Sequence, residues 1–258
     1  MSLSGQTALV TGASRGLGRA IARRLAREGA AVWVNYVTRA GEADKVVEEI
    51  RSAGGRANAV CADIGDPAQV QEMVQRVTGE LGPLSILVNN AGLAIRGTLE
   101  SFIPADLERM RRTNVDGLIH VTRAAIPGMQ ERRYGRVVNI TSIAGHGTTL
   151  PGSTFYAATK AAVSTLTRRF AMELSPQGIT VNAVAPGFIL TDMVKQGRDA
   201  AESEKLFKKI SELTMVGRVG DPEDIAHAVA FLVAPESGFI TAQVITVDGG
   251  RMDYIGHP

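Results

Sequence analysis

A tyrosine and a lysine stand at helical spacing in this sequence and could together move a proton. Tyr156 and Lys160 occupy positions i and i+4 of the run YAATK, which places both side chains on one face of a helix. A free phenol has a pKa of about 10, and a nearby positive charge lowers such a value by roughly 1–3 units. Ser142 lies upstream, just after an apolar strand-like run, and adds a hydroxyl group. These residue types are suited to general acid–base chemistry.

A glycine-rich turn near the start of the chain predicts a dinucleotide site. Residues 11–18 read TGASRGLG and connect the apolar run Thr7–Val10 to a helical segment. Glycines permit a tight turn and let backbone N–H groups approach a pyrophosphate, whose charge the helix N-terminus favours. The spacing is a variant of G-x-G-x-x-G, and its place between strand and helix supports the prediction. The cofactor contacts expected here are Gly12, Ser14, Arg15, Gly16, Leu17 and Gly18.

The end of the second strand favours NADPH over NADH. An acidic residue there binds the ribose 2′-hydroxyl of NAD, whereas an arginine accommodates the 2′-phosphate of NADP. Residues 34–39 read VNYVTR, which includes Asn35 as a further expected cofactor contact and no carboxylate. Arg15 in the glycine turn and Arg39 after the strand supply positive charge. We therefore expect NADP as the cofactor, with NAD as the alternative.

Two further strand ends supply expected cofactor contacts. Asp63 and Ile64 follow the third strand, and the sequence NNAG, residues 89–92, follows the fourth. Ligands of open parallel sheets bind at the carboxyl ends of the strands, and glycine permits close backbone approach. Asp63 is equally compatible with capping the helix that begins near Pro67. The contacts expected from these two strand ends are Asp63, Ile64, Asn90, Ala91 and Gly92.

Short β-rich runs alternate with longer helical patterns along the whole chain. The strand runs are almost continuously apolar, which is typical of strands covered by helices on both faces. This alternation predicts a doubly wound parallel α/β sheet with right-handed crossovers. The expected strands are Thr7–Val10, Ala31–Asn35, Asn58–Cys61, Ile86–Asn89, Arg136–Ile140, Ile179–Ala185 and Val244–Val247. The expected helices are Leu17–Glu28, Glu42–Ala53, Pro67–Leu81, Ala105–Gln130, Phe155–Leu174 and Pro222–Val233.

Composition excludes several other classes of protein. The net charge of +2 is spread along 258 residues, so neither a nucleic-acid-binding stripe nor a polybasic membrane segment stands out. No apolar run approaches the roughly 18 residues of a membrane span, and the N-terminus lacks the pattern of a signal peptide. The single cysteine, Cys61, rules out an internal disulfide, and no Cys/His spacing indicates a metal. We expect a cytoplasmic protein without a metal site.

One long connection interrupts the regular alternation. The segment Pro186–Gly220 follows a strand end and contains an amphipathic stretch around Glu202–Leu213. A long connection at the carboxyl edge of a parallel sheet is where a substrate lid is expected. We predict such a lid near residues 187–217, and the alternative is an ordinary surface insertion.

The chain resembles the short-chain dehydrogenase/reductase family over nearly its full length. The residues that carry the resemblance are the TGASRGLG turn, Asn89–Gly92, Asn114, Ser142, Tyr156, Lys160 and the pair Pro186-Gly187. The resemblance implies a single Rossmann-type domain over residues 1–258, with seven parallel strands in the order 3-2-1-4-5-6-7. It also implies cofactor contacts from Pro186, Gly187 and Thr191, with Thr191 on the nicotinamide carboxamide and Ile189 behind it.

The same resemblance implies an activity and a role for each catalytic residue. Such enzymes transfer a hydride between a nicotinamide and a carbonyl or alcohol carbon. Tyr156 would supply or accept the proton, and the Ser142 hydroxyl would hold the carbonyl oxygen. Lys160 would lower the pKa of Tyr156 and bind the nicotinamide ribose. Asn114 would position a water molecule that links the lysine to solvent.

The substrate is less well defined by the sequence. Within the family the chain is most similar to bacterial 3-oxoacyl-[acyl-carrier-protein] reductases, which implies an acyl-thioester substrate and a possible acyl carrier protein as partner. Arg133 matches one basic docking position of those enzymes near the mouth of the cleft, whereas the other is Gln177. The loop Gly145–Thr154 is one residue longer than is usual in the family. We expect His146 within it to be an ordinary loop histidine, with a substrate contact as the alternative.

Two alternative functions remain open at this stage. The strand end Asn35-Tyr36 also resembles sugar dehydrogenases such as glucose 1-dehydrogenase, so a small polyol or keto acid is the alternative substrate class. A catalytically silent nucleotide-sensing protein is a remote alternative, because a fold does not fix a function. The family resemblance further implies a homotetramer, formed through the helices near Ala105–Gln130 and Phe155–Leu174 and the C-terminal strand.

Overall fold

A sheet of seven parallel strands forms the centre of the molecule. The computed structural model describes residues 2–191 and 200–254 of the chain. The strands lie in the order β3-β2-β1-β4-β5-β6-β7, and each neighbouring pair is parallel. This confirms the doubly wound, single-domain α/β sheet that the sequence predicts. The strands are β1 (Thr7–Val10), β2 (Ala31–Tyr36), β3 (Arg56–Cys61), β4 (Leu84–Asn89), β5 (Gly135–Ile140), β6 (Ile179–Pro186) and β7 (Val244–Val247).

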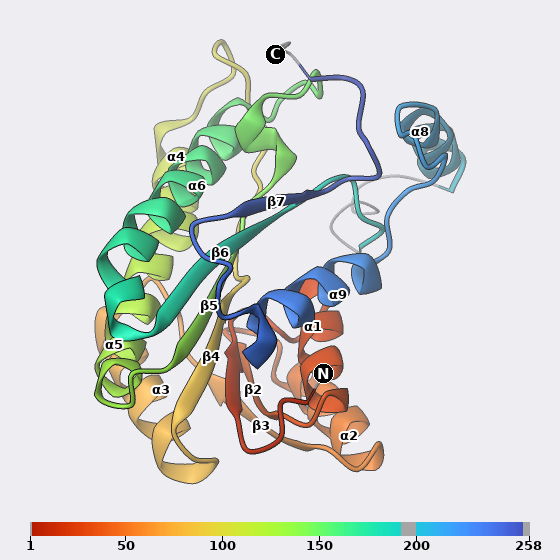
Figure 1. The fold of residues 1–258 in the computed structure, drawn as a ribbon. Helices are drawn as coiled ribbons and strands as arrows, with labels where there is room; N and C mark the ends of the chain where they lie inside the picture. Colours follow the sequence, from red (N-terminus) through yellow and green to blue (C-terminus); the bar gives the residue numbers. More distant parts are fainter. Residues whose placement is uncertain (1, 192–199, 255–258) are drawn as a thin grey trace.

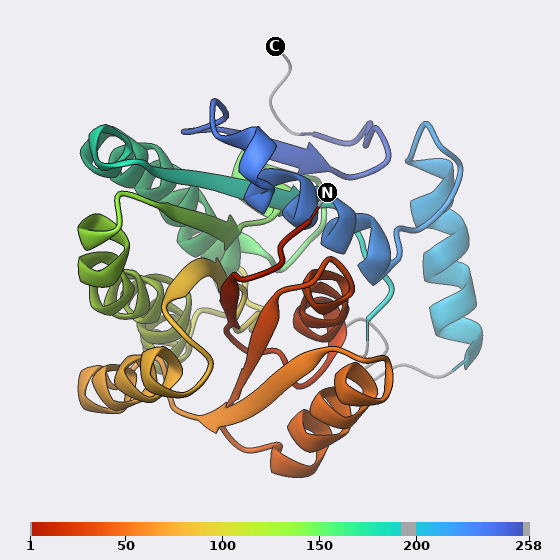
Figure 2. The same ribbon diagram turned by 60° about the horizontal axis from the view of Figure 1, so that its bottom comes forward.

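Helices cover both faces of this sheet. Helices α1, α2 and α9 pack on one face, and α3, α5 and α6 pack on the other, as Figures 1 and 2 show. The helices are α1 (Gly16–Arg27), α2 (Ala40–Ser52), α3 (Pro67–Glu80), α4 (Pro104–Arg111), α5 (Leu118–Glu131), α6 (Thr154–Leu174), α8 (Ala200–Glu212) and α9 (Pro222–Val233). None of these helices is long and apolar enough to span a membrane.

Burial on two faces explains why the strands are apolar throughout. Every residue of β1, β4, β5 and β6 is buried. Leu25 of α1 and Val229 of α9 belong to the core on one face, and Met73 of α3 and Met129 of α5 to the core on the other. Each fully buried side chain of this size contributes about 1.5–3 kcal/mol of stability relative to an exposed one. The sheet is therefore a rigid frame for the loops at its carboxyl edge.

One predicted helix is divided in the structure. The sequence predicts a single helix over Ala105–Gln130, whereas α4 and α5 are separated by a π-helical turn, η1 (Arg112–Gly117). Asn114 lies in this wider turn, and its side-chain amide bonds to the backbone of Leu93 and to the hydroxyl of Thr159. A π-turn of this kind is a local insertion within a helix and often marks a functional site.

The long connection after β6 carries a helix of its own. The predicted amphipathic stretch Glu202–Leu213 corresponds to α8, which lies outside the two helical layers (Figure 1). Residues 192–199 of the predicted lid lie outside the described residues. The lid role of this segment therefore stays a prediction.

Candidate active site

A cleft of about 370 Å³ opens at the carboxyl ends of the strands. Its walls come from the residues that follow β1, β2, β4, β5 and β6, so residues far apart in sequence meet there. Of the residues predicted to form the site, the cleft is lined by Gly12, Ser14, Arg15, Gly16, Leu17, Gly18, Asn90, Ala91, Gly92, Ser142, Tyr156, Lys160, Pro186, Gly187, Ile189 and Thr191. Asn35, Asp63, Ile64 and Asn114 are not among the residues that line the cleft.

The glycine turn is shaped to receive a phosphate group. Gly12 and Gly16 have φ angles of +61° and +55°, and a Cβ on Gly12 would lie 2.9 Å from the Cα of Ala91. Helix α1 begins at Gly16, its N-cap residue Arg15 makes no side-chain capping bond, and its first turn contains no acidic residue. Backbone N–H groups at such a helix start favour an anion. The turn therefore fits a pyrophosphate, as the sequence predicts.

The amide side chains of Asn35 and Asn90 hold this turn in place. The Oδ1 of Asn35 accepts a bond from Gly12 N at 3.1 Å, and its Nδ2 donates to the Ala62 carbonyl at 3.0 Å. Asn90 Nδ2 donates to the carbonyl oxygens of Thr11 and Gly12 at 2.8 and 3.1 Å. Asn35 is almost fully buried, so it positions the turn and does not face the cleft. The sequence analysis singled out Asn35 as a cofactor contact, but it did not predict that Asn35 would hold the turn through its own hydrogen bonds.

The cleft is basic where it meets the end of β2. Arg15 and Arg39 both line it, together with Tyr36, Val37 and Thr38. The cleft-lining residues of this strand end include no carboxylate. An additional phosphate would meet two guanidinium groups here, whereas a free ribose 2′-hydroxyl would have no carboxylate to accept its bond.

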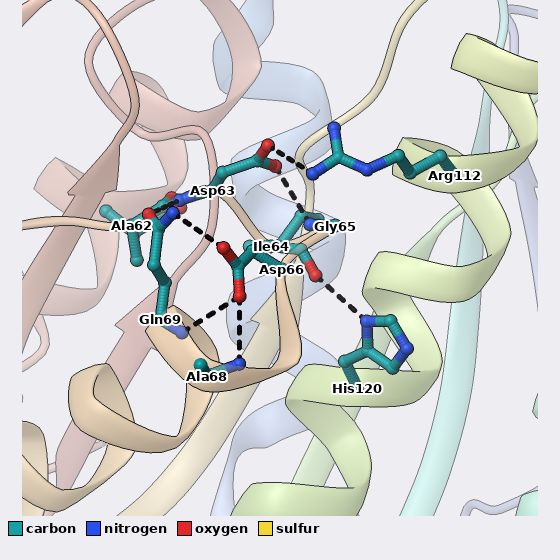
Figure 3. Close-up of polar contacts among 10 residues, drawn as sticks. Ala62, Asp63, Ile64, Gly65, Asp66, Ala68, Gln69, Arg112 and His120 are labelled. Atoms are coloured by element: carbon teal, nitrogen blue, oxygen red, sulfur yellow. Dashed lines mark hydrogen bonds and ion pairs between the residues drawn. The ribbon is translucent and has the colours of Figure 1, made fainter.

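Side chains of η1 and α5 contact the turn that follows β3 and hold it in place (Figure 3). Asp63 forms an ion pair with Arg112 at 2.8 Å and accepts a bond from Gly65 N at 2.9 Å. The carbonyl of Ile64 faces His120 Nδ1 at 3.3 Å. A Cβ on Gly65 would lie 2.9 Å from the Arg112 side chain, so glycine lets the arginine cross the turn. Arg112 had no recognisable signal in the sequence, because its partner is 49 residues earlier in the chain.

Helix α6 brings the tyrosine and the lysine to the same wall of the cleft. Lys160 is buried, and its Nζ donates to the carbonyl of Ile140 at 2.8 Å and lies 5.9 Å from the Tyr156 ring centroid. Burial lowers the pKa of the Lys160 ammonium to about 8. Burial raises the pKa of the Tyr156 phenol, and its hydrogen bond with Ser142 opposes that rise.

In the chain by itself, the loss of solvation around the Tyr156 hydroxyl has the larger effect on its pKa. The expected lowering by Lys160, helped by the charge of an oxidised nicotinamide, stays a prediction. Because its pKa is raised, Tyr156 holds its proton at neutral pH.

Asn114 lies one layer behind the cleft and connects three elements. Its Oδ1 accepts from Leu93 N at 2.7 Å, while its Nδ2 donates to Leu93 O at 2.8 Å and to Thr159 Oγ1 at 2.9 Å. Gly92 borders the same place, since a Cβ there would lie 3.4 Å from both Asn114 Oδ1 and Lys160 Nζ. The missing side chain leaves a polar space between the amide and the ammonium.

The segment after β6 closes the cleft opposite the glycine turn. A Cβ on Gly16 would lie 3.8 Å from the Thr191 methyl group, so the two walls face each other closely. Phe188 of this segment also lines the cleft, as do Leu93 and Ala94 after β4. The sequence analysis did not single out these three residues, because apolar side chains in loops carry no motif.

Arg133 does not lie near the mouth of the cleft in the chain itself. It precedes β5 and donates to the carbonyl of Pro176, which precedes β6. Both strands therefore begin beside it, whereas the cleft lies where they end. A strand of this length spans about 20 Å. The expectation that Arg133 lies near the mouth of the cleft is therefore wrong within one subunit. Docking of an acidic carrier stays a prediction.

Comparisons with known proteins agree with this architecture. A family model described as enoyl-(acyl carrier protein) reductase matches residues 12–251. The 3-oxoacyl-[acyl-carrier-protein] reductase FabG of Staphylococcus epidermidis is 41% identical, with 95% of this chain and 98% of that protein covered. A short-chain dehydrogenase/reductase from Serratia marcescens superposes with a TM-score of 0.89 at 38% identity, covering 97% of this chain and 99% of that one.

A third relative was solved with a nucleotide. The 3-oxoacyl (acyl-carrier-protein) reductase from Agrobacterium tumefaciens with NADP bound has a TM-score of 0.89 and 34% identity. The superposition covers 96% of this chain and 95% of that one.

Proposed function

Because this chain belongs to the short-chain dehydrogenase/reductase family, we propose that it is an NADPH-dependent oxidoreductase that reduces a carbonyl group. One observation carries the proposal: Tyr156, Ser142 and Lys160 line the same cleft as the phosphate-binding turn Gly12–Gly18. This arrangement supports the proposal because hydride transfer to a carbonyl requires a proton donor beside the nucleotide.

The residues of the chain divide the chemistry among them. The nicotinamide cofactor, when bound, supplies the hydride. Tyr156 donates the proton to the carbonyl oxygen, and its raised pKa keeps that proton available at neutral pH. The Ser142 hydroxyl holds the same oxygen as negative charge develops. Lys160 binds ribose hydroxyls, and a water held between Lys160 and Asn114 returns the proton from solvent.

The basic end of the cleft supports NADPH as the preferred cofactor. Arg15 and Arg39 would hold the 2′-phosphate, and the glycine turn would hold the pyrophosphate. Thr191 and Ile189 would hold the nicotinamide end, opposite the turn. The Asp63–Ile64 turn, which follows β3, would contact the adenine at the edge of the cleft. NADH remains the weaker cofactor in this proposal.

The lining of the inner cleft favours an acyl chain over a polyol. Beside the hydroxyls of Ser142 and Tyr156, this part is lined by Leu93, Ala94 and Phe188. Apolar walls stabilise an aliphatic chain, whereas each sugar hydroxyl would lose its hydrogen bonds to water without replacement. We therefore propose a 3-oxoacyl thioester, presented by a carrier protein or a smaller thiol, as the substrate class. The segment 187–217, with α8, would cover it as a lid.

A homotetramer is the assembly that we propose. Phe231 of α9 and Phe239 before β7 are exposed, with Phe239 fully so, and Met172 of α6 is more than half exposed. These side chains lie on or beside α6 and the C-terminal strand, two of the elements expected at interfaces. Light scattering on the purified chain tests this assembly, and a monomer at micromolar concentration would contradict it.

A substrate panel with both cofactors tests the proposed function. The purified chain is assayed by NADPH and NADH consumption with a 3-oxoacyl thioester, a small uncharged ketone and a keto sugar acid. We expect NADPH consumption, with the largest kcat/KM for the thioester. Turnover confined to the sugar acid would favour the polyol alternative. No turnover with any carbonyl compound, despite NADPH binding, would point to a silent nucleotide sensor.

A further inference from the structure

A short C-terminal segment joins two loops at the substrate side of the molecule. Residues 249–254 follow β7 and lie beside the loop between β5 and α6 and beside the residues that follow α8 (Figure 1). On one side, Thr149 N donates to the Asp253 carbonyl at 3.0 Å, and Thr148 pairs with Tyr254. On the other side, Met252 N donates to Leu213 O at 3.1 Å, and Thr214 pairs with Arg251.

The bonds continue along the segment toward β7. Met215 N and Val216 N donate to the carbonyls of Gly250 and Gly249, both at 3.1 Å. Because α8 ends at Glu212, these bonds hold the residues that follow the helix directly. The six residues thus form a strip between two loops that do not follow one another in the chain.

A buried ion pair lies at the centre of this strip. Arg251 Nη2 donates a hydrogen bond to Asp253 Oδ2 at 2.8 Å, and Arg251 Nε lies 2.5 Å from Oδ1 in an ion-pair contact without a hydrogen bond of its own. Asp253 Oδ2 also accepts the hydroxyl of Thr149 at 2.7 Å. Arg251 is 7% exposed, so the pair is shielded from water. Removing either partner of such a pair would leave the other charge buried without compensation, so the two side chains stay together.

The residues just before the strip, Val247 and Asp248, contact the wall of the cleft. Gly187, a lining residue, donates its N–H to Val247 O at 2.9 Å, and a Cβ on Gly187 would lie 2.6 Å from the Cα of Asp248. Asp248 accepts the hydroxyl of Tyr254 at 2.6 Å, which ties the end of the strip back to its start. The loop on the other side runs between Ser142 and Tyr156, which both line the cleft.

We propose that the strip Gly249–Tyr254 is a clamp, in which Asp253 is a positioning residue for substrate recognition. Asp253, held by Arg251, sets the position of the longer β5–α6 loop through Thr149, and the same strip sets the base of α8. The two loops therefore move together, and their spacing decides which substrates fit. This inference rests on the proposed function only in assuming that the substrate enters between these loops.

Hydrogen exchange tests the clamp without any assumption about the substrate. Thr149→Val removes one hydroxyl donor and is expected to speed amide exchange in residues 147–153 alone. Asp253→Asn weakens the centre of the strip and is expected to speed exchange in 147–153 and in 213–217 together, by about five- to tenfold. The matched control is Thr148→Val, which makes the same change at a neighbour that pairs through its backbone. Unchanged exchange at 213–217 in Asp253→Asn would overturn the clamp.

Kinetics test its consequence for recognition. In Asp253→Asn and Thr149→Val we expect KM for the accepted carbonyl substrate to rise about five- to tenfold, with KM for NADPH within twofold. Thr149→Ser keeps the donor and is expected to restore wild-type KM. A general loss of folded enzyme would instead lower kcat alone and leave both KM values unchanged. If hydrogen exchange speeds up but KM is unchanged, the strip does link the two loops, and its role in substrate recognition is refuted.

Discussion

The nucleotide half and the substrate half of the cleft are built in different ways. In the nucleotide half, the turn after β1 is braced by Asn35, a buried residue of the adjacent strand 23 positions away. In the substrate half, the β5–α6 loop is held by Asp253, which is 104 positions from Thr149 and lies outside any strand or helix. The nucleotide half is thus fixed by the sheet itself, whereas the substrate half depends on bonds between loops. This separation allows one half to vary while the other remains constant.

The largest expected effect is the loss of the proton donor that lies between the two halves. Tyr156→Phe keeps the ring and removes the hydroxyl, so kcat should fall by about 10²–10⁴. The Kd for NADPH should stay within a few-fold, because the nucleotide half is untouched. Steady-state kinetics and fluorescence titration with NADPH measure the two quantities. Tyr134→Phe, beyond the opposite edge of the sheet, is the control, and a Tyr156→Phe enzyme with over a tenth of wild-type rate would refute the assignment.

Arg15→Ala should affect the nucleotide half alone. Removing one charged partner of the 2′-phosphate costs about 1–3 kcal/mol, which corresponds to a five- to 150-fold weaker binding of NADPH. Binding of NADH and KM for the carbonyl substrate should change little. Cofactor titrations of the variant and of Arg27→Ala, an exposed arginine at the far end of α1, make the comparison. A wild-type kcat/KM that is higher with NADH would show that the cofactor preference is wrong.

The pH dependence should report the lysine that serves both halves. Burial disfavours the charged form, so Lys160 is protonated below about pH 8 and loses its charge as the pH rises through that value. We expect kcat/KM for carbonyl reduction to fall about tenfold per pH unit above this point. Lys160→Arg, if active, should not show this fall in kcat/KM at high pH, because a guanidinium stays protonated. A profile that is flat to pH 9.5 would contradict the role of Lys160.

The smallest expected effect is at Arg133, which belongs to neither half. Because this residue lies where β5 and β6 begin, Arg133→Glu should change KM by less than about twofold for carrier-bound and carrier-free thioesters alike. Added salt should act on both substrates equally. A rise in KM that is confined to the carrier-bound substrate would mean that the carrier docks at this edge of the sheet. The carrier would then have to deliver its acyl chain to the cleft of another subunit.

Much of the nucleotide half could be predicted from the sequence, and the structure agrees on the placement of its main residues. The strands lie within two residues of their expected ends, because continuous apolar runs are required where both sheet faces are buried. Gly12, Arg15 and Asn90 line the cleft as expected, since the residues after parallel strands meet at one edge. The π-turn at Asn114 could not be predicted, because the contacts that accompany it come from Leu93 and Thr159.

The sequence by itself thus determined the sheet, its order of elements and the residues at its carboxyl edge, because these follow from local periodicity and motifs with fixed backbone requirements. Only the tertiary structure decided the state of Tyr156, whose pKa depends on how deeply neighbouring elements bury its hydroxyl. It also decided that Arg112 meets Asp63, that Arg133 lies away from the cleft, and that Asp253 holds Thr149. The physical reason is the same in each case. The effect of a charge or a hydroxyl depends on its distance from other groups and on its burial, and neither can be calculated from the spacing of residues along the chain.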